Sequence, residues 1–269
     1  MKLCFSTLAC PEWTLDQIVH AARENNIGGV DFRGLGAEID VTKLPAFNEG
    51  LSETLNLFRR NDLQMPCLNT SVTLVSPPDR WTAMLEECLR TAELASKTET
   101  RFMRIFGGAV PKEMSREEAR AMGHRHLRQL TKITLPLRVQ ILLETHDQWT
   151  TSAEVLSMIG EFDSAEVSVL WDLQNPFRRG ETPAETVRAL GDRIRHVHVK
   201  DCLAPPPGET KAVPKFLGEG DVPIVECVKA LQSIGYEGWY CLEAEKRWIA
   251  STQEPAETIP QFAKFMRQI

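Results

Sequence analysis

The sequence lacks the clusters of positive charge on which nucleic-acid binding depends. Its 269 residues carry 37 acidic and 31 basic side chains, giving a formal net charge of -6. Like charges never occur in runs of five or six. Because affinity for a phosphate backbone comes from clustered Lys and Arg, we expect no nucleic-acid partner. A small polar substrate fits this charge balance better.

Paired cysteines are also missing. The seven cysteines are scattered along the chain, and no two have a CxxC spacing. An odd number of cysteines at such spacings predicts neither a disulfide framework nor a zinc ribbon. We therefore expect reduced cysteines and a cytoplasmic protein.

Long apolar runs are absent too. No window of the sequence approaches the length that a membrane-spanning helix needs. The first ten residues, MKLCFSTLAC, end in small residues like a lipoprotein signal, but their apolar run is short and Pro11 and Glu12 follow at once. We expect neither a signal peptide nor a membrane partner.

Eight short β-like runs alternate with amphipathic segments of helical length. The runs cover residues 2–6, 28–33, 64–69, 101–106, 138–145, 167–173, 194–200 and 238–244. Strict alternation predicts a parallel α/β sheet, and eight units without a linker predict one domain over residues 1–269, a (β/α)8 TIM barrel. The runner-up is a doubly wound open sheet. Its dinucleotide-binding form needs a GxGxxG after the first strand, and the sequence has none there.

Each helical segment is preceded by residues that are typical of helix starts. These starts are Thr14, Ser52, Asp79, Ser115 with Glu118, Thr151 or Ser152, Thr182 with Pro183, Asp221 with Pro223, and Glu254 with Pro255. They support the division into eight strand-helix units.

Chemistry in such a barrel belongs at the C-terminal ends of the strands. The fifth to eighth strands each end in a side chain that can bind a metal: Glu144, Asp172, His198 and Glu243. Three carboxylates in a low-dielectric pocket cannot all stay ionised without a cation. Three oxygen ligands with one imidazole suit Mn²⁺, Mg²⁺, Co²⁺ or Zn²⁺. We predict one divalent ion bound by these residues; the alternative is four solvated polar side chains.

The seventh strand, RHVHVKD, has two different faces. Side chains alternate along a strand, so His196, His198 and Lys200 share one face while Val197 and Val199 share the other. The polar face predicts a metal, a carboxylate cluster or a polyoxygenated ligand beside it. His196 lies one layer below His198, and we interpret it as a buried core histidine.

Five phrases, in this order, resemble the xylose-isomerase-like TIM-barrel superfamily and its sugar phosphate isomerase/epimerase branch: LLETHDQWTT, LWDLQNPFRRGETPAET, RIRHVHVKD, LGEGDVPI and GYEGWYCLEAEKRW. The likeness covers nearly the whole chain and is specific from about residue 138 onward. It implies that Glu144, Asp172, His198 and Glu243 hold a divalent metal. It also implies that Glu144 and Glu243 form an acid/base pair and that Lys200 contacts substrate oxygens.

Asn175 departs from the family pattern. Many members place a histidine three residues after the aspartate of the sixth strand, where this chain has Asn175. Asparagine can hydrogen-bond a substrate hydroxyl, but it cannot titrate near neutrality or replace imidazole equally well as a ligand. This difference weakens any assignment of substrate by analogy. It also argues against the multi-zinc nucleases of the superfamily, which use that histidine.

Further polar residues near the strand ends are weaker candidates. His146 shares the parity of Glu144 and is either a substrate contact or a residue facing solvent. Arg104 is favoured as a structural ion-pair partner over a substrate clamp. Lys246 and Arg247 could bind a substrate carboxylate or phosphate, or could be solvated.

The sequence thus predicts a metal-dependent isomerase or epimerase of a sugar or sugar phosphate. Glu144 and Glu243 would transfer protons through a metal-stabilised enediolate. One alternative is a lyase of the same fold that dehydrates an inosose or a 3-dehydroshikimate, and another is a non-catalytic sugar-binding barrel. The sequence fixes neither the metal nor the substrate, and it is compatible with a homo-oligomer.

Overall fold

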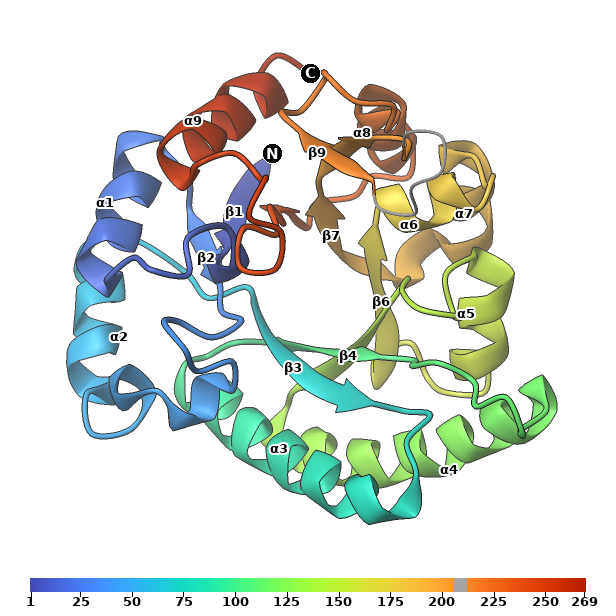
Figure 1. Cartoon of the computed structure of the whole chain (residues 1–269). Coiled ribbons are helices and arrows are strands. Elements are labelled where there is room, and N and C mark those ends of the chain that lie inside the picture. Colours follow the sequence, from blue (N-terminus) through green and yellow to red (C-terminus); the bar gives the residue numbers. More distant parts are fainter. Residues whose placement is uncertain (206–211) are drawn as a thin grey trace.

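The computed structural model describes residues 1–205 and 212–269. Its main feature is a ring of eight parallel strands with helices outside it (Figure 1). Their order in the sheet is β2-β1-β10-β7-β6-β5-β4-β3. The bounds are β1 Lys2–Ser6, β2 Gly29–Asp31, β3 Cys67–Thr73, β4 Phe102–Phe106, β5 Gln140–Glu144, β6 Val167–Asp172, β7 Ile194–Val199 and β10 Trp239–Leu242.

The ring closes between β2 and β3. Two isolated parallel bridges join these strands, Gly29 with Gln64 and Phe32 with Leu68. The amide of Val30 donates to Gln64 O at 3.0 Å, and that of Asn69 donates to Phe32 O at 3.0 Å. The predicted TIM barrel is therefore confirmed, and the open sheet is rejected.

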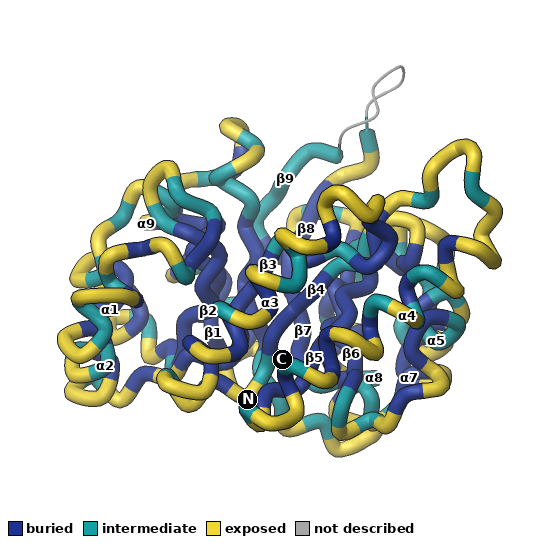
Figure 2. The backbone as a smooth tube through the Cα atoms, turned by 90° about the horizontal axis from the view of Figure 1, so that it is seen from below, coloured by how far each residue is buried: buried dark blue, intermediate teal, exposed yellow. Residues whose placement is uncertain are grey.

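Eight helices of the described chain form the outer ring. They are α1 Leu15–Glu24, α2 Leu51–Arg60, α3 Pro78–Lys97, α4 Arg116–Thr134, α5 Ser152–Ile159, α7 Pro183–Leu190, α8 Ile224–Ser233 and α9 Pro255–Met266. Short 3-10 turns lie at Thr7–Ala9, Val41–Lys43, Pro45–Phe47, Leu135–Leu137 and Gly191–Arg193. In Figure 2 the strands are buried, and the outer surfaces of the helices are exposed. Within the described residues, no helix combines the length and apolarity that crossing a membrane requires.

Helix starts were predicted with mixed success. Capping boxes at Thr14, Ser115, Thr151 and Thr182 satisfy the first backbone amides of their helices, as expected. The starts expected at Ser52 and Asp79 were wrong, since the caps are Gly50 and Pro77, and of the pair Asp221 with Pro223 only Pro223 is the cap. Asp79 lies inside the first turn, where a carboxylate still favours the helix. Asp221 instead accepts a hydrogen bond from the amide of Ala204.

Two small elements that the sequence pattern did not predict lie at the C-terminal end of the barrel. Helix α6 (Gln174–Arg178) follows β6, and an antiparallel hairpin of β8 (Asp201–Leu203) and β9 (Val213–Lys215) follows β7. Figure 2 shows the hairpin at the end of the barrel opposite both chain termini. These additions build up the rim on the side where β5, β6, β7 and β10 end.

Candidate functional site

Three of the four predicted ligands converge at the end of the barrel. Glu144 ends β5, His198 lies in β7, and Glu243 directly follows β10. One ligand atom from each lies within 4.8 Å of the others. His198 Nδ1 is 3.2 Å from Glu144 Oε1 and 3.0 Å from Glu243 Oε1. All three residues are buried, and we call them the outer cluster.

The fourth predicted ligand, Asp172, lies beside the outer cluster but is otherwise engaged. It ends β6 in register with His198 and is fully buried. Its Oδ1 accepts hydrogen bonds from the amides of Gln174 at 2.9 Å and Asn175 at 3.2 Å, which fixes the start of α6. Its Oδ2 lies 2.8 Å from Lys200 Nζ. Asp172 is thus held by a cation of the protein itself.

Lys200 and Arg104 supply positive charge among these carboxylates. Lys200 Nζ lies 2.8 Å from Glu243 Oε2 and 2.9 Å from Glu245 Oε1, in addition to its contact with Asp172. Arg104 Nε lies 3.1 Å from Glu144 Oε2 and also donates to Asn69 Oδ1. Arg104 is therefore the structural ion-pair partner that its sequence position favoured.

These neighbours set the protonation of the site. Burial raises the pKa of Glu243, but His198 and Lys200 outweigh burial and hold that pKa well below its usual range. Burial and Glu243 raise the pKa of Glu144, whereas Arg104 and His198 lower it to a net value below normal. Burial lowers the pKa of His198, but Glu243 and Glu144 raise it well above normal. Both glutamates are consequently ionised at neutral pH.

Asp172 behaves differently from the two glutamates. Its burial raises the pKa of the carboxyl, and the nearby carboxylates Glu243 and Glu144 add to that effect. Lys200 opposes the shift without cancelling it. Asp172 is therefore the carboxyl of the site that most needs an additional cation.

A cavity of about 650 Å³ opens over this region. Lys200, Glu243 and Glu245 lie in its wall, together with Gln174 and Arg178 from α6. A larger cavity of about 920 Å³ lies at the other end of the barrel, among the residues that begin the strands. Because active sites of TIM barrels lie at the C-terminal face, the smaller cavity is the one that matters for chemistry.

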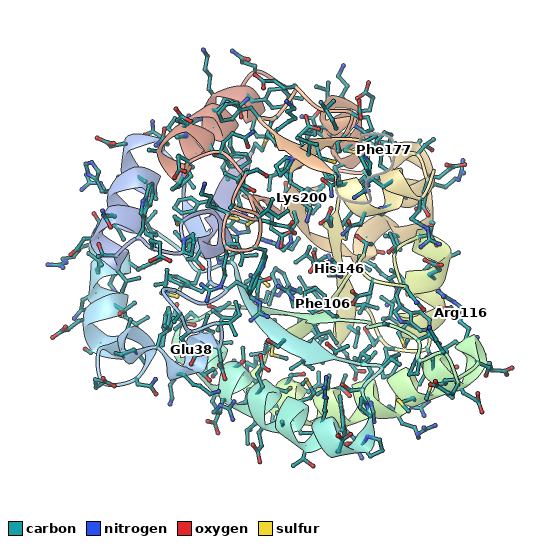
Figure 3. The ribbon with its side chains drawn as sticks, viewed as in Figure 1. Glu38, Phe106, Arg116, His146, Phe177 and Lys200 are labelled. Atoms are coloured by element: carbon teal, nitrogen blue, oxygen red, sulfur yellow. The ribbon has the colours of Figure 1, made fainter. Side chains whose placement is uncertain are left out.

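His146 follows β5 two residues after Glu144. Figure 3 shows His146, Phe106 and Lys200 gathered near the centre of the barrel. The rings of His146 and Phe106 are 4.8 Å apart, and His146 Nδ1 lies 2.8 Å from Asp147 Oδ1. Burial lowers the pKa of His146, but Asp147 and Glu144 raise it to about 9. His146 is thus a protonated imidazole at neutral pH.

The remaining candidates have distinct surroundings. Asn175 Nδ2 donates to Thr145 O at 3.0 Å, so part of its amide is used within the protein. Lys246 Nζ pairs with Glu254 Oε1 at 2.7 Å and holds its own loop. Arg247 Nη1 is buried without a hydrogen bond in the described part of the chain. Of these three, Arg247 is the one with an unused buried donor.

Below the outer cluster, His196 is fully buried, and its Nε2 lies 2.7 Å from Asp31 Oδ2. It is a core histidine with a charged partner, as favoured from the sequence. The sequence analysis did not predict that Asp31 of β2 would be the partner of His196.

A closed ring of eight parallel strands, with ionisable residues gathered where the strands end, defines a TIM barrel. Residues 19–269 match the model of the xylose isomerase-like TIM barrel. The chain belongs to this family.

Similar curated proteins include both dehydratases and an epimerase. An inosose dehydratase of Geobacillus thermodenitrificans is 32% identical over 133 residues, which cover 44% of this chain and 42% of the relative. A D-psicose 3-epimerase of Enterocloster bolteae is 26% identical over 129 residues, which cover 46% of this chain and 40% of the relative. The matched part spans about two fifths of the length of these relatives.

Solved structures with the same fold cover the whole chain. The IOLI protein with a binding zinc atom superposes with a TM-score of 0.83 and 18% identity, covering 100% of this chain and 97% of that one. The probable 3-DHS dehydratase AsbF of Bacillus anthracis gives a TM-score of 0.81 and 19% identity, with 99% of each chain covered. At these identities, the likeness shows the fold.

Proposed function

We propose that the protein is an enzyme that removes a proton from the carbon beside a carbonyl in a sugar or sugar-like polyol, and that it acts as an isomerase or epimerase. The observation that carries this proposal is the convergence of Glu144, His198 and Glu243 at a cavity whose wall includes Lys200, Glu243 and Glu245. We further propose that residues 1–269 act as one domain. Seven free, buried cysteines support a reducing, cytoplasmic location.

The residues of the outer cluster fit a divalent ion. Two carboxylates and an imidazole lie within 4.8 Å of one another. His198 Nε2 is buried without a hydrogen bond in the described chain, whereas Asp172 Oδ2 and Glu144 Oε2 lie against Lys200 Nζ and Arg104 Nε. Such oxygen-rich donor sets suit Mn²⁺, Mg²⁺, Co²⁺ or Zn²⁺, and a structural neighbour was solved with zinc. Glu144, Asp172, His198 and Glu243 would hold the ion.

A divalent ion bound there would act as a Lewis acid and stabilise the enediolate that forms from the substrate. Glu144 and Glu243 are ionised, so either can accept the proton, and the carboxyl that has gained it can return it to the substrate. Return of a proton from the opposite face would require the second carboxylate to take one up from solvent first. Lys200, in the wall of the cavity, and His146 are cations of the site, and Asn175 and Arg247 offer further donors. We propose that these four residues bind substrate oxygens.

Dehydration is the second candidate, because inosose dehydratases recur among the relatives. Loss of water begins with the same proton removal and additionally needs an acid for the departing hydroxyl. His146, with a pKa of about 9, carries a proton that it could donate. A dehydratase would therefore need no residue beyond Glu144, Glu243 and His146, which are already proposed for the site.

One experiment separates these functions. The metal-loaded protein is incubated in D₂O with ketoses, their phosphates, an inosose and 3-dehydroshikimate. Deuterium uptake at carbon without loss of water supports an isomerase or epimerase, whereas an ultraviolet-absorbing enone product supports a dehydratase. Binding of a sugar without either reaction would contradict the proposal and leave a non-catalytic barrel.

A further inference from the structure

A second group of ligand-type side chains lies deeper in the barrel. Cys4 of β1, Asp31 of β2, His196 of β7 and Cys241 of β10 each offer one ligand atom, and these atoms lie within 4.8 Å of one another. All four residues are fully buried, with no exposed surface. We call them the inner cluster.

Strand order brings the inner cluster together. The strands β2, β1, β10 and β7 are consecutive neighbours in the sheet, and β1 and β2 lie together in Figure 1. His196 precedes His198 by two residues, and Cys241 precedes Glu243 by two. Because strand side chains alternate, the inner cluster faces the barrel interior one layer below the outer cluster. The two clusters share no residue.

Contacts within the protein leave the inner cluster poorly satisfied. Asp31 Oδ2 lies 2.7 Å from His196 Nε2, but His196 Nδ1 has no hydrogen-bond partner in the described chain. The thiol of Cys4 donates to Tyr240 O at 3.8 Å, and that of Cys241 donates to Leu242 O at 3.7 Å. Both are long, weak contacts. Asp31 Oδ1 also accepts from the amide of Cys67 at 3.1 Å, but the two thiols and His196 Nδ1 have no strong partner in the described chain.

The donor set points to one kind of ion. Two sulfurs, one nitrogen and one oxygen match a closed tetrahedral zinc site, and thiolate ligands select against Mg²⁺ and Mn²⁺. With zinc-sulfur bonds of about 2.3 Å, ligand atoms in a tetrahedron lie about 3.8 Å apart. No two ligand atoms of the inner cluster are more than 4.8 Å apart, so side-chain rotations that move them by about 1 Å or less bring them to that spacing.

We propose that the inner cluster binds a structural Zn²⁺ ion, separate from any ion at the outer cluster. Both thiols lose their protons to solvent when the ion binds. The four protein ligands fill the coordination shell, and none of them lies in the wall of the cavity above the outer cluster. The ion would therefore tie β2, β1, β10 and β7 together and would not contact substrate.

Cobalt substitution tests this proposal in the full-length protein. Co²⁺ bound by thiolates gives an intense charge-transfer absorption in the near ultraviolet, which a site of carboxylates and imidazole does not give. We expect this absorption in the wild type, with two Co²⁺ ions per chain by elemental analysis. Cys4→Ser/Cys241→Ser should abolish the absorption and lose one ion. Cys227→Ser, which changes a buried thiol of α8, is the matched control and should keep both.

The outer cluster is tested in the same way by His198→Ala. This variant should lose the other ion and retain the thiolate absorption, so the two sites fail independently. If the double serine variant does not fold, the wild-type spectrum still decides. Co²⁺-loaded wild type without thiolate absorption would overturn the proposal, as would absorption that persists in Cys4→Ser/Cys241→Ser.

Discussion

Lys200 is the residue whose loss should most disturb the metal-free site. Lys200→Met leaves Asp172, Glu243 and Glu245 without their shared ammonium. Breaking such a buried pair costs about 3–5 kcal/mol. The chelator-treated variant should therefore unfold at a clearly lower temperature than the chelator-treated wild type. Added Mn²⁺ should recover much of that loss, because an ion that binds only the native state stabilises it.

Lys246→Met is the matched control for Lys200→Met. It removes a second lysine that pairs with a glutamate, but Glu254 is largely exposed. Loss of the Lys246 ammonium should therefore lower the unfolding temperature less than loss of Lys200, and Mn²⁺ should not specifically restore it. Equal stability of Lys200→Met and wild type without metal would show that Lys200 does not neutralise the site.

Glu144→Gln and Glu243→Gln should each lower turnover by about 10²- to 10⁴-fold at saturating metal. Glutamine keeps an oxygen for the ion but loses the group that carries the proton. The rate of deuterium uptake, measured beside metal content, separates the two effects. Glu245→Gln is the control, since Glu245 contacts Lys200 but lies outside the outer cluster. Full activity of either cluster variant at high metal would remove that residue from the proton-transfer role.

At the level of single residues, equivalent positions at four strand ends predicted that Glu144, Asp172, His198 and Glu243 would meet, and all but Asp172 share one cluster. They did not predict that Lys200 would reach Asp172. The register of β6 and β7 shifts between Val169 and Leu170, and no local pattern reveals such a shift. Part of the inner cluster could have been predicted from the sequence. Cys241 and His196 lie two residues before Glu243 and His198, so they point to the same side of their strands. The scattered spacing of the cysteines concealed it.

At the level of elements, Asp40 ties the segment after β2 to α3. Its Oδ1 accepts from the amide of Thr42 and its Oδ2 from Arg90 Nη2 at 3.0 Å. Asp40→Asn should lower the free energy of unfolding at pH 7 by about 1 kcal/mol. Denaturant titrations over a range of pH measure the difference from wild type.

The pH dependence of that difference has a definite sign. Burial raises the pKa of Asp40, but hydrogen bonds from Thr42 and Arg90 lower it below the ordinary 3.8. Its stabilising contribution is therefore present above pH 3.8 and is lost as the pH falls through the lower folded value. Lys43→Met, which removes a longer and more exposed contact, should change little at any pH. A constant difference down to strong acid would contradict the assignment.

The order of strands and helices could be predicted from the sequence, whereas some boundaries could not. The third strand was expected at residues 64–69, but β3 covers Cys67–Thr73. Gln64 pairs only as an isolated bridge, and the polar second half of β3 lacks an apolar run. Helix α6 and the β8–β9 hairpin were missed because segments of three to five residues are too short to show periodicity.

At the level of the whole molecule, the barrel should open first where β2 meets β3. This seam is held by isolated bridges, whereas β5 and β6 pair continuously. Regions with few backbone hydrogen bonds open at lower free energy. Hydrogen exchange should therefore be faster for the amides of Val30 and Asn69 than for those of β6. Equal protection at the two places would show that the seam is as stable as the rest of the sheet.

In the protein without bound metal, all seven cysteines are free thiols and are buried. A thiol-reactive reagent should consequently leave the native protein unlabelled and should modify only molecules that open. The position of the first labelled cysteine then reports which part of the barrel opened, since Cys4, Cys67 and Cys241 lie in strands while Cys88 and Cys227 lie in helices. The chain thus carries its own set of reporters for partial unfolding, with no need for an engineered label.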